Sequence, residues 1–170
     1  MPKIMLTGHR PKKLGGYEPE SPLNRAIQGK IQELLIRAKN YPYPDDLIII
    51  SGMAIGCDQW WAEIALDLGL EVHAYIPFIG QESRWPPEAQ AKYQELLKRC
   101  KQVICVSSGS YFSWKLQKRN RAMVDTSDLA VAIWDGSISG TGNCISYLQK
   151  KKVPYLHVHP ATLEDSWINP

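Results

Sequence analysis

Short apolar runs alternate along the chain with segments whose apolar residues recur at helical spacing. Several of the runs are continuously apolar, as strands buried on both faces of a parallel sheet are. This alternation of strand and helix is typical of an α/β protein. The predicted strands are residues 3–8, 46–52, 71–78, 102–107, 129–134 and 154–158.

Four segments between these strands have the pattern of helices. Residues 23–38 and 89–100 each carry one apolar stripe, and two prolines at the start of the second favour a helix N-terminus. Residues 57–68 are followed by Gly69, which suits a helix C-cap, and residues 142–152 end in three lysines, which suit the negative end of a helix dipole.

These elements predict a Rossmann-like, doubly wound sheet of about six mainly parallel strands, with helices on both faces and the order 3-2-1-4-5-6. A length of 170 residues, 44% of them hydrophobic and 22% charged, is typical of one globular domain, so we expect residues 1–170 to form a single domain. In such sheets ligands bind beyond the carboxyl ends of the strands, here between the first and the fourth.

Composition narrows the class of protein further. The cysteines Cys57, Cys100, Cys105 and Cys144 form no CxxC pair, so we expect reduced thiols in a cytoplasmic protein, without zinc. The sequence has no signal-like segment and no apolar stretch of membrane length, so no membrane partner is expected. A net charge of +3 suits anionic small ligands and supports nucleic-acid binding only weakly.

Two glycine-containing loops follow predicted strands. The stretch "SGMAIGCD", residues 51–58, follows the second strand, and "SGTGN", residues 139–143, follows the fifth. Main-chain N–H groups at the start of the next helix could hold an anion in each loop. The alternative is ordinary turn chemistry, with Ser, Thr or Asp as helix caps. Neither loop matches GxGxxG or the GxxxxGK sequence of ATP-binding loops.

Several charged residues near these loops allow two interpretations. Arg10 and Arg119 could bind phosphates, and His9 is either a donor to a ligand or a surface histidine. Asp58 is either a helix cap or an acceptor for ribose hydroxyls. The irregular segment 9–22 is long for a loop, so it either is mobile or covers a ligand.

Other features carry weaker signals. The basic run 115–125 predicts a solvated helix face, part of which could point inward. His157 and His159 share one face of a strand, but with no third ligand nearby we expect no metal site. Trp85 is the tryptophan that we expect near a ligand, where it could stack on a base.

Five ordered motifs resemble one family. They are "TGHR", "SGMAIGCD", "YIPF" followed by "GQESRW", "RNRAMVD" and "WDGSISGT", and the resemblance runs from Lys3 to about His159. The chain is similar to the YpsA-like branch of the SLOG superfamily, which groups the DNA-processing DprA domain with the Lonely-Guy phosphoribohydrolases. The resemblance implies a Rossmann-like fold and a sensor or processor of nucleotide derivatives, such as those made from NAD or ADP-ribose.

When the family's site residues are carried over by position, each of these motifs contributes to a nucleotide-binding site. The loop 139–143 adds the hydroxyl of Ser139 to this site. We expect no cofactor and no metal. Because dimers are common in the wider superfamily, we expect the protein to form a homo-oligomer, most simply a dimer. The other implied nucleotide-binding residues are Thr7, Gly8, His9, Arg10, Ser51, Gly52, Met53, Gly56, Asp58, Phe78, Arg119, Asn120, Gly140 and Thr141.

The sequence departs from the Lonely-Guy pattern at one important position. Those enzymes have "PGGxGTxxE", and Cys144 stands where the glutamate that helps to cleave the N-glycosidic bond would be. Cys144 is either a nucleophile activated by the helix terminus or a packed core cysteine. Cleavage would otherwise need another carboxylate. The candidates are Asp58, Glu63, Glu82 and Asp125.

Three functions therefore remain open. The first is a protein that senses or sequesters a phosphorylated nucleoside or an ADP-ribose-like ligand. The second is a nucleotide N-glycosidase or transferase. The third is nucleic-acid binding of the DprA type, which the basic clusters 98–101, 115–121 and 150–152 favour and the modest net charge disfavours.

Overall fold

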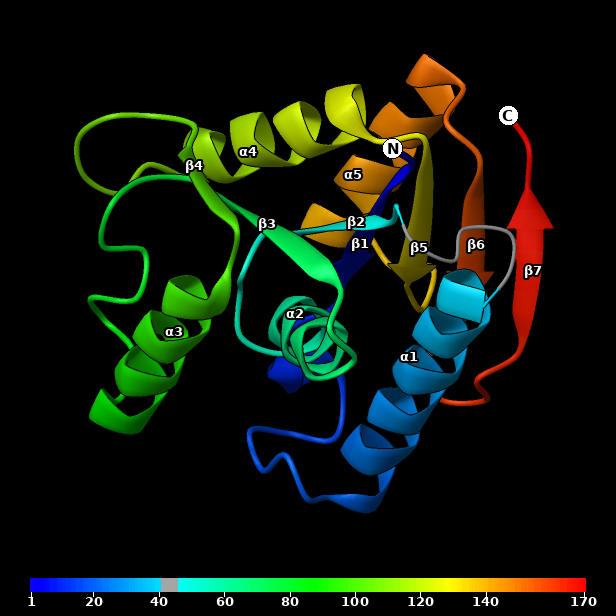
Figure 1. Cartoon of the computed structure of the whole chain (residues 1–170), viewed down its shortest axis with the longest axis horizontal. Coiled ribbons are helices and arrows are strands. Elements are labelled where there is room, and N and C mark those ends of the chain that lie inside the picture. Colours follow the sequence, from blue (N-terminus) through cyan, green and yellow to red (C-terminus); the bar gives the residue numbers. More distant parts are fainter. Residues whose placement is uncertain (41–45) are drawn as a thin grey trace.

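The computed structural model describes residues 1–40 and 46–170, and the strands within them form one seven-stranded sheet in the order β4-β3-β2-β1-β5-β6-β7 (Figure 1). Strands β1 to β6 are parallel, and β7 is antiparallel to β6. The predicted α/β class with a mainly parallel sheet is thereby confirmed. The strands are β1 (Lys3–Gly8), β2 (Ile48–Ser51), β3 (Glu71–Ile76), β4 (Gln102–Cys105), β5 (Leu129–Ile133), β6 (Tyr155–Val158) and β7 (Asp165–Ile168).

Helices cover both faces of the sheet (Figure 1). On one face, Ile27, Trp61 and Tyr93 of α1, α2 and α3 belong to one buried cluster with the apolar side chains of the strands. On the other face, Met123 of α4 and Leu148 of α5 belong to a second cluster. The helices are η1 (a 3-10 turn, Pro11–Lys13), α1 (Pro22–Asn40), α2 (Cys57–Asp67), α3 (Pro87–Arg99), α4 (Ser113–Thr126) and α5 (Gly140–Lys151).

The predicted strand order 3-2-1-4-5-6 is wrong in the placement of the fourth strand. β4 pairs with β3 at the edge of the sheet, and β5 pairs with β1 through Ile4 and Leu129. The edge position agrees with the exposure of β4, whose Val103 is 45% exposed. The point at which the crossovers change direction therefore lies between β1 and β5. The seventh strand, Asp165–Ile168, was not predicted because it is short and largely exposed.

β1 lies at the centre of the sheet, and its last residue fixes the start of α2. Met5 and Leu6 are fully buried between the two helical layers. A Cβ atom at Gly8 would lie 2.6 Å from the Cβ of Cys57, so only glycine lets the end of β1 meet the first turn of α2. None of the helices in the described parts of the chain combines the length and the apolar character needed to cross a bilayer.

Candidate functional site

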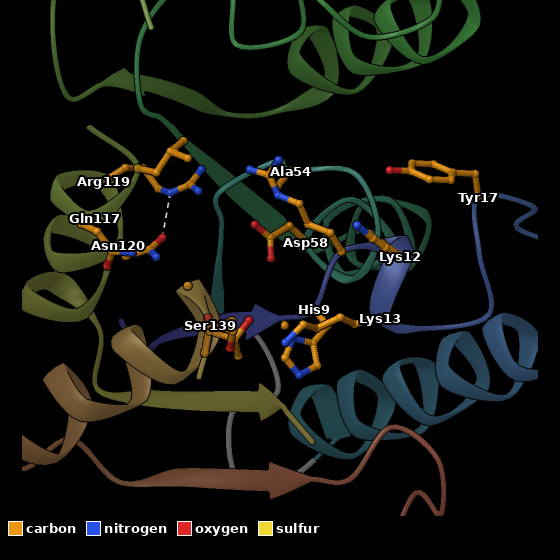
Figure 2. A pocket seen from close by; sticks show the side chains of 16 residues that line it. His9, Lys12, Lys13, Tyr17, Ala54, Asp58, Gln117, Arg119, Asn120 and Ser139 are labelled. Atoms are coloured by element: carbon orange, nitrogen blue, oxygen red, sulfur yellow. Dashed lines mark hydrogen bonds between the residues drawn. The ribbon is translucent and has the colours of Figure 1, made fainter. Parts of the chain in front are cut away.

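A cavity of about 440 Å³ opens at the carboxyl ends of the central strands, beside the switch between β1 and β5 (Figure 2). This is the edge at which doubly wound sheets hold their ligands. Its volume lies within the range of small-molecule pockets, about 300–1,000 Å³. The lining residues are Thr7, Gly8, His9, Arg10, Lys12, Lys13, Tyr17, Ala54, Asp58, Leu116, Gln117, Arg119, Asn120, Ser139, Gly140 and Thr141.

The cavity brings together most of the residues expected at a site, although they come from four separate parts of the chain. The segment after β1, the first turn of α2, the middle of α4 and the start of α5 each contribute. The expected residues that line it are Thr7, Gly8, His9, Arg10, Asp58, Arg119, Asn120, Ser139, Gly140 and Thr141.

Four other expected residues lie beneath the cavity and shape the loop after β2. The hydroxyl of Ser51 donates to the carbonyl oxygen of Asp58 at 2.7 Å and accepts from the amide of Met53 at 3.1 Å. Met53 is fully buried in the left-handed region, with φ of 61°. Gly56, with φ of 103°, begins α2 where a Cβ atom would lie 3.1 Å from the carbonyl oxygen of His9. Gly52 packs against side chains of the cavity, so these four residues support the site and do not line it.

Asp58 occupies the start of α2 and faces the cavity. Its carboxylate accepts a hydrogen bond from the main chain of Ala54, and its position in the first turn complements the positive end of the helix. Burial raises the pKa of Asp58, while Arg119 and Arg10 oppose the rise. Asp58 is not the N-cap of α2, which is Gly56, and its place in the lining of the cavity is compatible with the second interpretation, an acceptor for ribose hydroxyls. The loop after β2 therefore brings a carboxylate to the cavity, whereas its two glycines, Gly52 and Gly56, do not line it.

The start of α5 differs, because its first residues line the cavity. The hydroxyl of Ser139 accepts from the amide of Gly142 at 3.1 Å, and its carbonyl oxygen accepts from Asn143 at 2.9 Å. The two amides between them, those of Gly140 and Thr141, take part in neither bond, and both residues line the cavity. Two successive amides at a helix N-terminus form a ready binding site for an anion.

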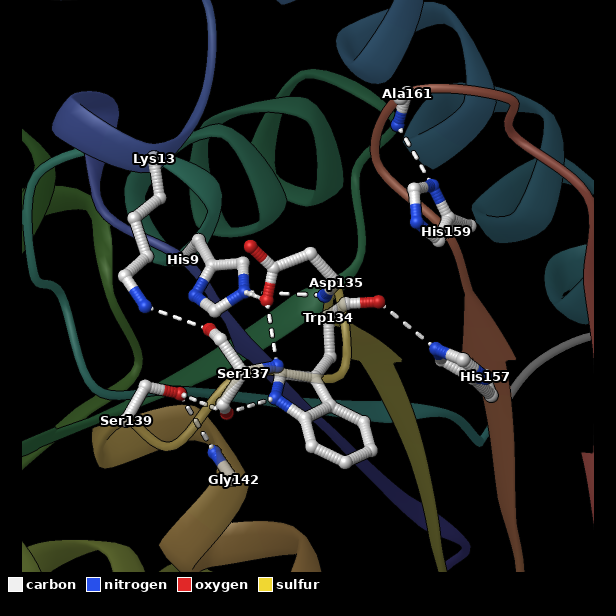
Figure 3. Close-up of polar contacts among 10 residues, drawn as sticks. All are labelled: His9, Lys13, Trp134, Asp135, Ser137, Ser139, Gly142, His157, His159 and Ala161. Carbon is white, nitrogen blue, oxygen red and sulfur yellow. Dashed lines mark hydrogen bonds and ion pairs between the residues drawn. The ribbon is translucent and has the colours of Figure 1, made fainter.

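A polar network joins the end of β1 to the loop before α5 (Figure 3). The Nε2 atom of His9, which is 3% exposed, lies 2.9 Å from a carboxylate oxygen of Asp135. The amide of Ser137 donates to that same oxygen at 2.9 Å, and the Nζ atom of Lys13 donates to the Ser137 hydroxyl at 2.6 Å. The indole of Trp134 donates to the carbonyl oxygen of Ser137 at 2.8 Å, so the loop is held on two sides.

The surroundings of Asp135 and His9 in this network shift the pKa values of both residues. The hydrogen bonds from Ser137, followed by the contact with His9, hold the pKa of Asp135 well below its usual range. Burial lowers the pKa of His9, although Asp135 opposes this shift. His9 is therefore a buried group that ties two loops together, not the surface histidine of the alternative interpretation.

The segment 9–22 supplies most of the positive charge of the cavity. Arg10, Lys12 and Lys13 line it together with Arg119, against the single lining carboxylate of Asp58. Pro11 is buried and begins the 3-10 turn that carries both lysines. The sequence patterns did not predict that the site includes Lys12, Lys13 and Tyr17. Two consecutive lysines in an unusually long loop could have indicated the first two. The cavity is also lined by Ala54, Leu116 and Gln117, whose residue types do not indicate a binding site.

Arg119 anchors α4 to the end of the sheet. It is 4% exposed, donates through Nη1 to the carbonyl oxygen of Gly52, and donates through Nε to Asn120 at 2.9 Å. Burial lowers the pKa of Arg119, and the nearby Asp58 opposes this shift. Lys115, one turn earlier, is also buried, whereas Lys118 and Arg121 are exposed. The basic run is therefore a solvated face only in part.

Comparisons with known proteins identify the family of this chain. The sequence matches the YspA SLOG family over residues 4–159. The chain belongs to this family. It is 31% identical over 136 residues to an uncharacterised SPbeta prophage-derived protein, YoqJ of Bacillus subtilis strain 168, and the match covers 71% of this chain and 76% of that protein.

The solved structures with the same fold include two DNA processing proteins. DprA of Streptococcus pneumoniae is 18% identical with a TM-score of 0.64, over 96% of this SLOG chain and 52% of that protein. DprA of Helicobacter pylori, described as binding single-stranded DNA, is 19% identical with a TM-score of 0.64, over 97% of this chain and 68% of that one. At sequence identities of 18% and 19%, the structural similarity to these proteins establishes a shared fold and nothing more.

The structure of this SLOG protein separates the candidate catalytic groups. Cys144 is 1% exposed, and burial raises the pKa of its thiol to about 11, so it is a packed core cysteine. Glu63 pairs with Lys92, and Glu82 accepts from Gln94. Asp125 pairs with Lys151 on the surface. Of the four candidate carboxylates, Asp58 is the one that lines the cavity.

The remaining expected residues of the SLOG protein lie elsewhere. Phe78 and Trp85 line a second cavity, of about 250 Å³, together with Tyr111. The Nε2 atom of His157 is hydrogen-bonded to the carbonyl oxygen of Trp134 at 2.8 Å, and the Nδ1 atom of His159 accepts from Ala161 at 3.1 Å (Figure 3). Each histidine therefore has a structural hydrogen bond.

Proposed function

We propose that this SLOG protein binds a phosphorylated nucleoside, of the nucleoside-phosphate or ADP-ribose and NAD-derived kind, as a sensor or sequestering protein. One observation carries the proposal. Gly140 and Thr141, the first two residues of α5, line the same cavity as Asp58, so a helix N-terminus can supply donors for an anion and a carboxylate an acceptor for hydroxyl groups.

The charges around the cavity support a phosphate at the start of α5. Arg10, Lys12 and Lys13 add positive charge to the helix terminus, and charge-assisted hydrogen bonds are the strong ones. Asp58 would repel a phosphate placed beside it, but it suits the hydroxyl groups of a ribose. The cations of the cavity therefore suit the phosphate of a nucleoside phosphate, and the carboxylate of Asp58 suits its ribose.

Binding is favoured over nucleophilic catalysis by the state of Cys144. A thiol with a pKa of about 11 is almost entirely protonated at neutral pH, so it is a poor nucleophile. Hydrolysis of an N-glycosidic bond is the second candidate function, because the buried carboxylate of Asp58 lies in the cavity. A carboxylate that steadies positive charge in the sugar is the group that such a reaction needs.

A third candidate is nucleic-acid binding, which two exposed aromatic residues favour. The rings of Phe112 and Trp114 stack with centroids 6.4 Å apart and are 55% and 54% exposed. The Nζ atom of Lys118 lies 6.0 Å from the Trp114 centroid. Exposed rings beside cations can stack the bases of a single strand. Binding of an oligothymidylate that weakens steeply with salt and with Trp114→Ala would support this function.

One experiment separates binding from cleavage. The purified protein is incubated with AMP, NAD, ADP-ribose and cyclic nucleotides, its melting temperature is measured, and each mixture is then analysed by chromatography. A raised melting temperature with an intact nucleotide supports the binding protein. Release of free base that Asp58→Asn abolishes supports the glycosidase. A melting temperature that none of these nucleotides changes contradicts both.

A further inference from the structure

A second cavity adjoins the first and has a different chemistry. It measures about 250 Å³ and shares Arg10 and Leu116 with the larger cavity, so these two side chains lie at the boundary. Its other lining includes the aromatic residues Phe78, Trp85 and Tyr111. The volume is smaller than the range for complete small-molecule ligands, about 300–1,000 Å³, so the second cavity suits one part of a ligand.

The aromatic rings of this cavity are held in place by the protein itself. Phe78 is 5% exposed, and its ring meets that of Tyr111 edge to face, with centroids 6.0 Å apart. The ring of Trp85 packs edge to face on Tyr93 at 5.4 Å. Rings that are already fixed lose little conformational freedom when a ligand stacks on them.

Lys115 holds the loop that carries Tyr111. Lys115 is buried, and its ammonium group donates to the carbonyl oxygens of Ser108 and Ser110, which lie three residues and one residue before Tyr111. The same ammonium lies 5.8 Å from the centroid of Phe78. One buried cation therefore contacts Phe78 and also holds the segment that precedes Tyr111.

We propose that the second cavity binds the planar base of the nucleotide whose phosphate lies at the start of α5, with Arg10 between the two parts. This inference rests on the proposed function and narrows it, because it requires a ligand with an aromatic ring. Three aromatic residues line this cavity, and aromatic side chains are the groups on which bases stack. The shared position of Arg10 places one cation where a phosphate or ribose connects the two cavities.

Calorimetric titration with AMP and with ribose 5-phosphate tests the inference. Tyr111→Ala is the test variant, and Trp167→Ala is its control, since both residues are exposed aromatics, 54% and 56%, but Trp167 lies on β7 and lines neither cavity. We expect AMP to bind the wild type at least about tenfold more tightly than ribose 5-phosphate. Tyr111→Ala should weaken AMP binding about tenfold without changing that of ribose 5-phosphate. Trp167→Ala should change neither affinity.

A conservative variant separates stacking from folding. Tyr111→Phe keeps the ring and should bind AMP as the wild type does, and melting curves establish that all variants are folded. The inference is overturned if AMP and ribose 5-phosphate bind equally well, or if Tyr111→Ala weakens both to the same extent. In those cases the anion site of the proposed function survives. If neither compound binds the wild type, the proposed function fails and this inference fails with it.

Discussion

The guanidinium of Arg119 donates a hydrogen bond to the carbonyl oxygen of Gly52, which joins the middle of α4 to the end of β2. A side chain at Gly52 would collide with this arrangement, because its Cβ atom would lie 2.6 Å from Nη1 of Arg119 and 2.9 Å from Oδ2 of Asp58. The absence of a Cβ atom at one position therefore allows a cation and a carboxylate to share the base of the cavity.

Gly52→Ala should displace both charged groups while leaving the fold intact, since the colliding atoms are the ends of side chains. We expect the free energy of unfolding to fall by about 1–3 kcal/mol, the usual cost of an overpacked site. The affinity for AMP should fall about tenfold. Urea unfolding and calorimetry measure the two effects. Gly140→Ala is the comparison for stability, because its Cβ atom would approach Gln117 no closer than 3.9 Å.

Gly140→Val should abolish nucleotide binding without unfolding the protein. The new side chain has room at its Cβ atom, but its branches would cover the amides at the start of α5. AMP affinity should fall at least about tenfold, with a change in stability of about 1 kcal/mol or less. Gly29→Val, on the exposed side of α1, should bind AMP normally. Undiminished binding by Gly140→Val would remove this helix terminus from the site.

The buried His9 should make the protein less stable in mild acid. Burial lowers the pKa of His9, so below its unfolded value of about 6.5 the unfolded chain binds more protons than the folded one. The free energy of unfolding should therefore fall between about pH 7 and pH 5. His9→Gln should reduce this pH dependence in urea titrations at the two pH values. An identical pH dependence in the two proteins would rule out a neutral buried His9.

The cysteines should differ sharply in reactivity. Cys144 and Cys57 are buried with raised thiol pKa values, whereas Cys105 is exposed. At about pH 8 a thiol reagent should modify Cys105 quickly and the two buried cysteines only after denaturant is added. Mass spectrometry of the modified peptides identifies the sites. Rapid modification of Cys144 in the folded protein would reopen its candidacy as a nucleophile.

Local sequence patterns located the candidate site better than they assigned its chemistry. Ser51 ends β2 and Asp58 lies in the first turn of α2, yet the Ser51 hydroxyl is bonded to the main chain of Asp58, and only Asp58 lines the cavity. No pattern separates these two roles, because they depend on which way each side chain points after folding. The role of Asp135 was not predicted either, because its partner His9 lies 126 residues away in the chain.

The sequence by itself determined that buried parallel strands alternate with amphipathic helices, since apolar periodicity is a local property of the chain. It also placed polar loops at the carboxyl ends of β1, β2 and β5. Only the tertiary structure decided that β5 pairs with β1, that β4 lies at an edge, and that Lys115 and Arg119 turn inward. Those outcomes depend on contacts between segments far apart in the chain, which the spacing of residues within one segment does not encode.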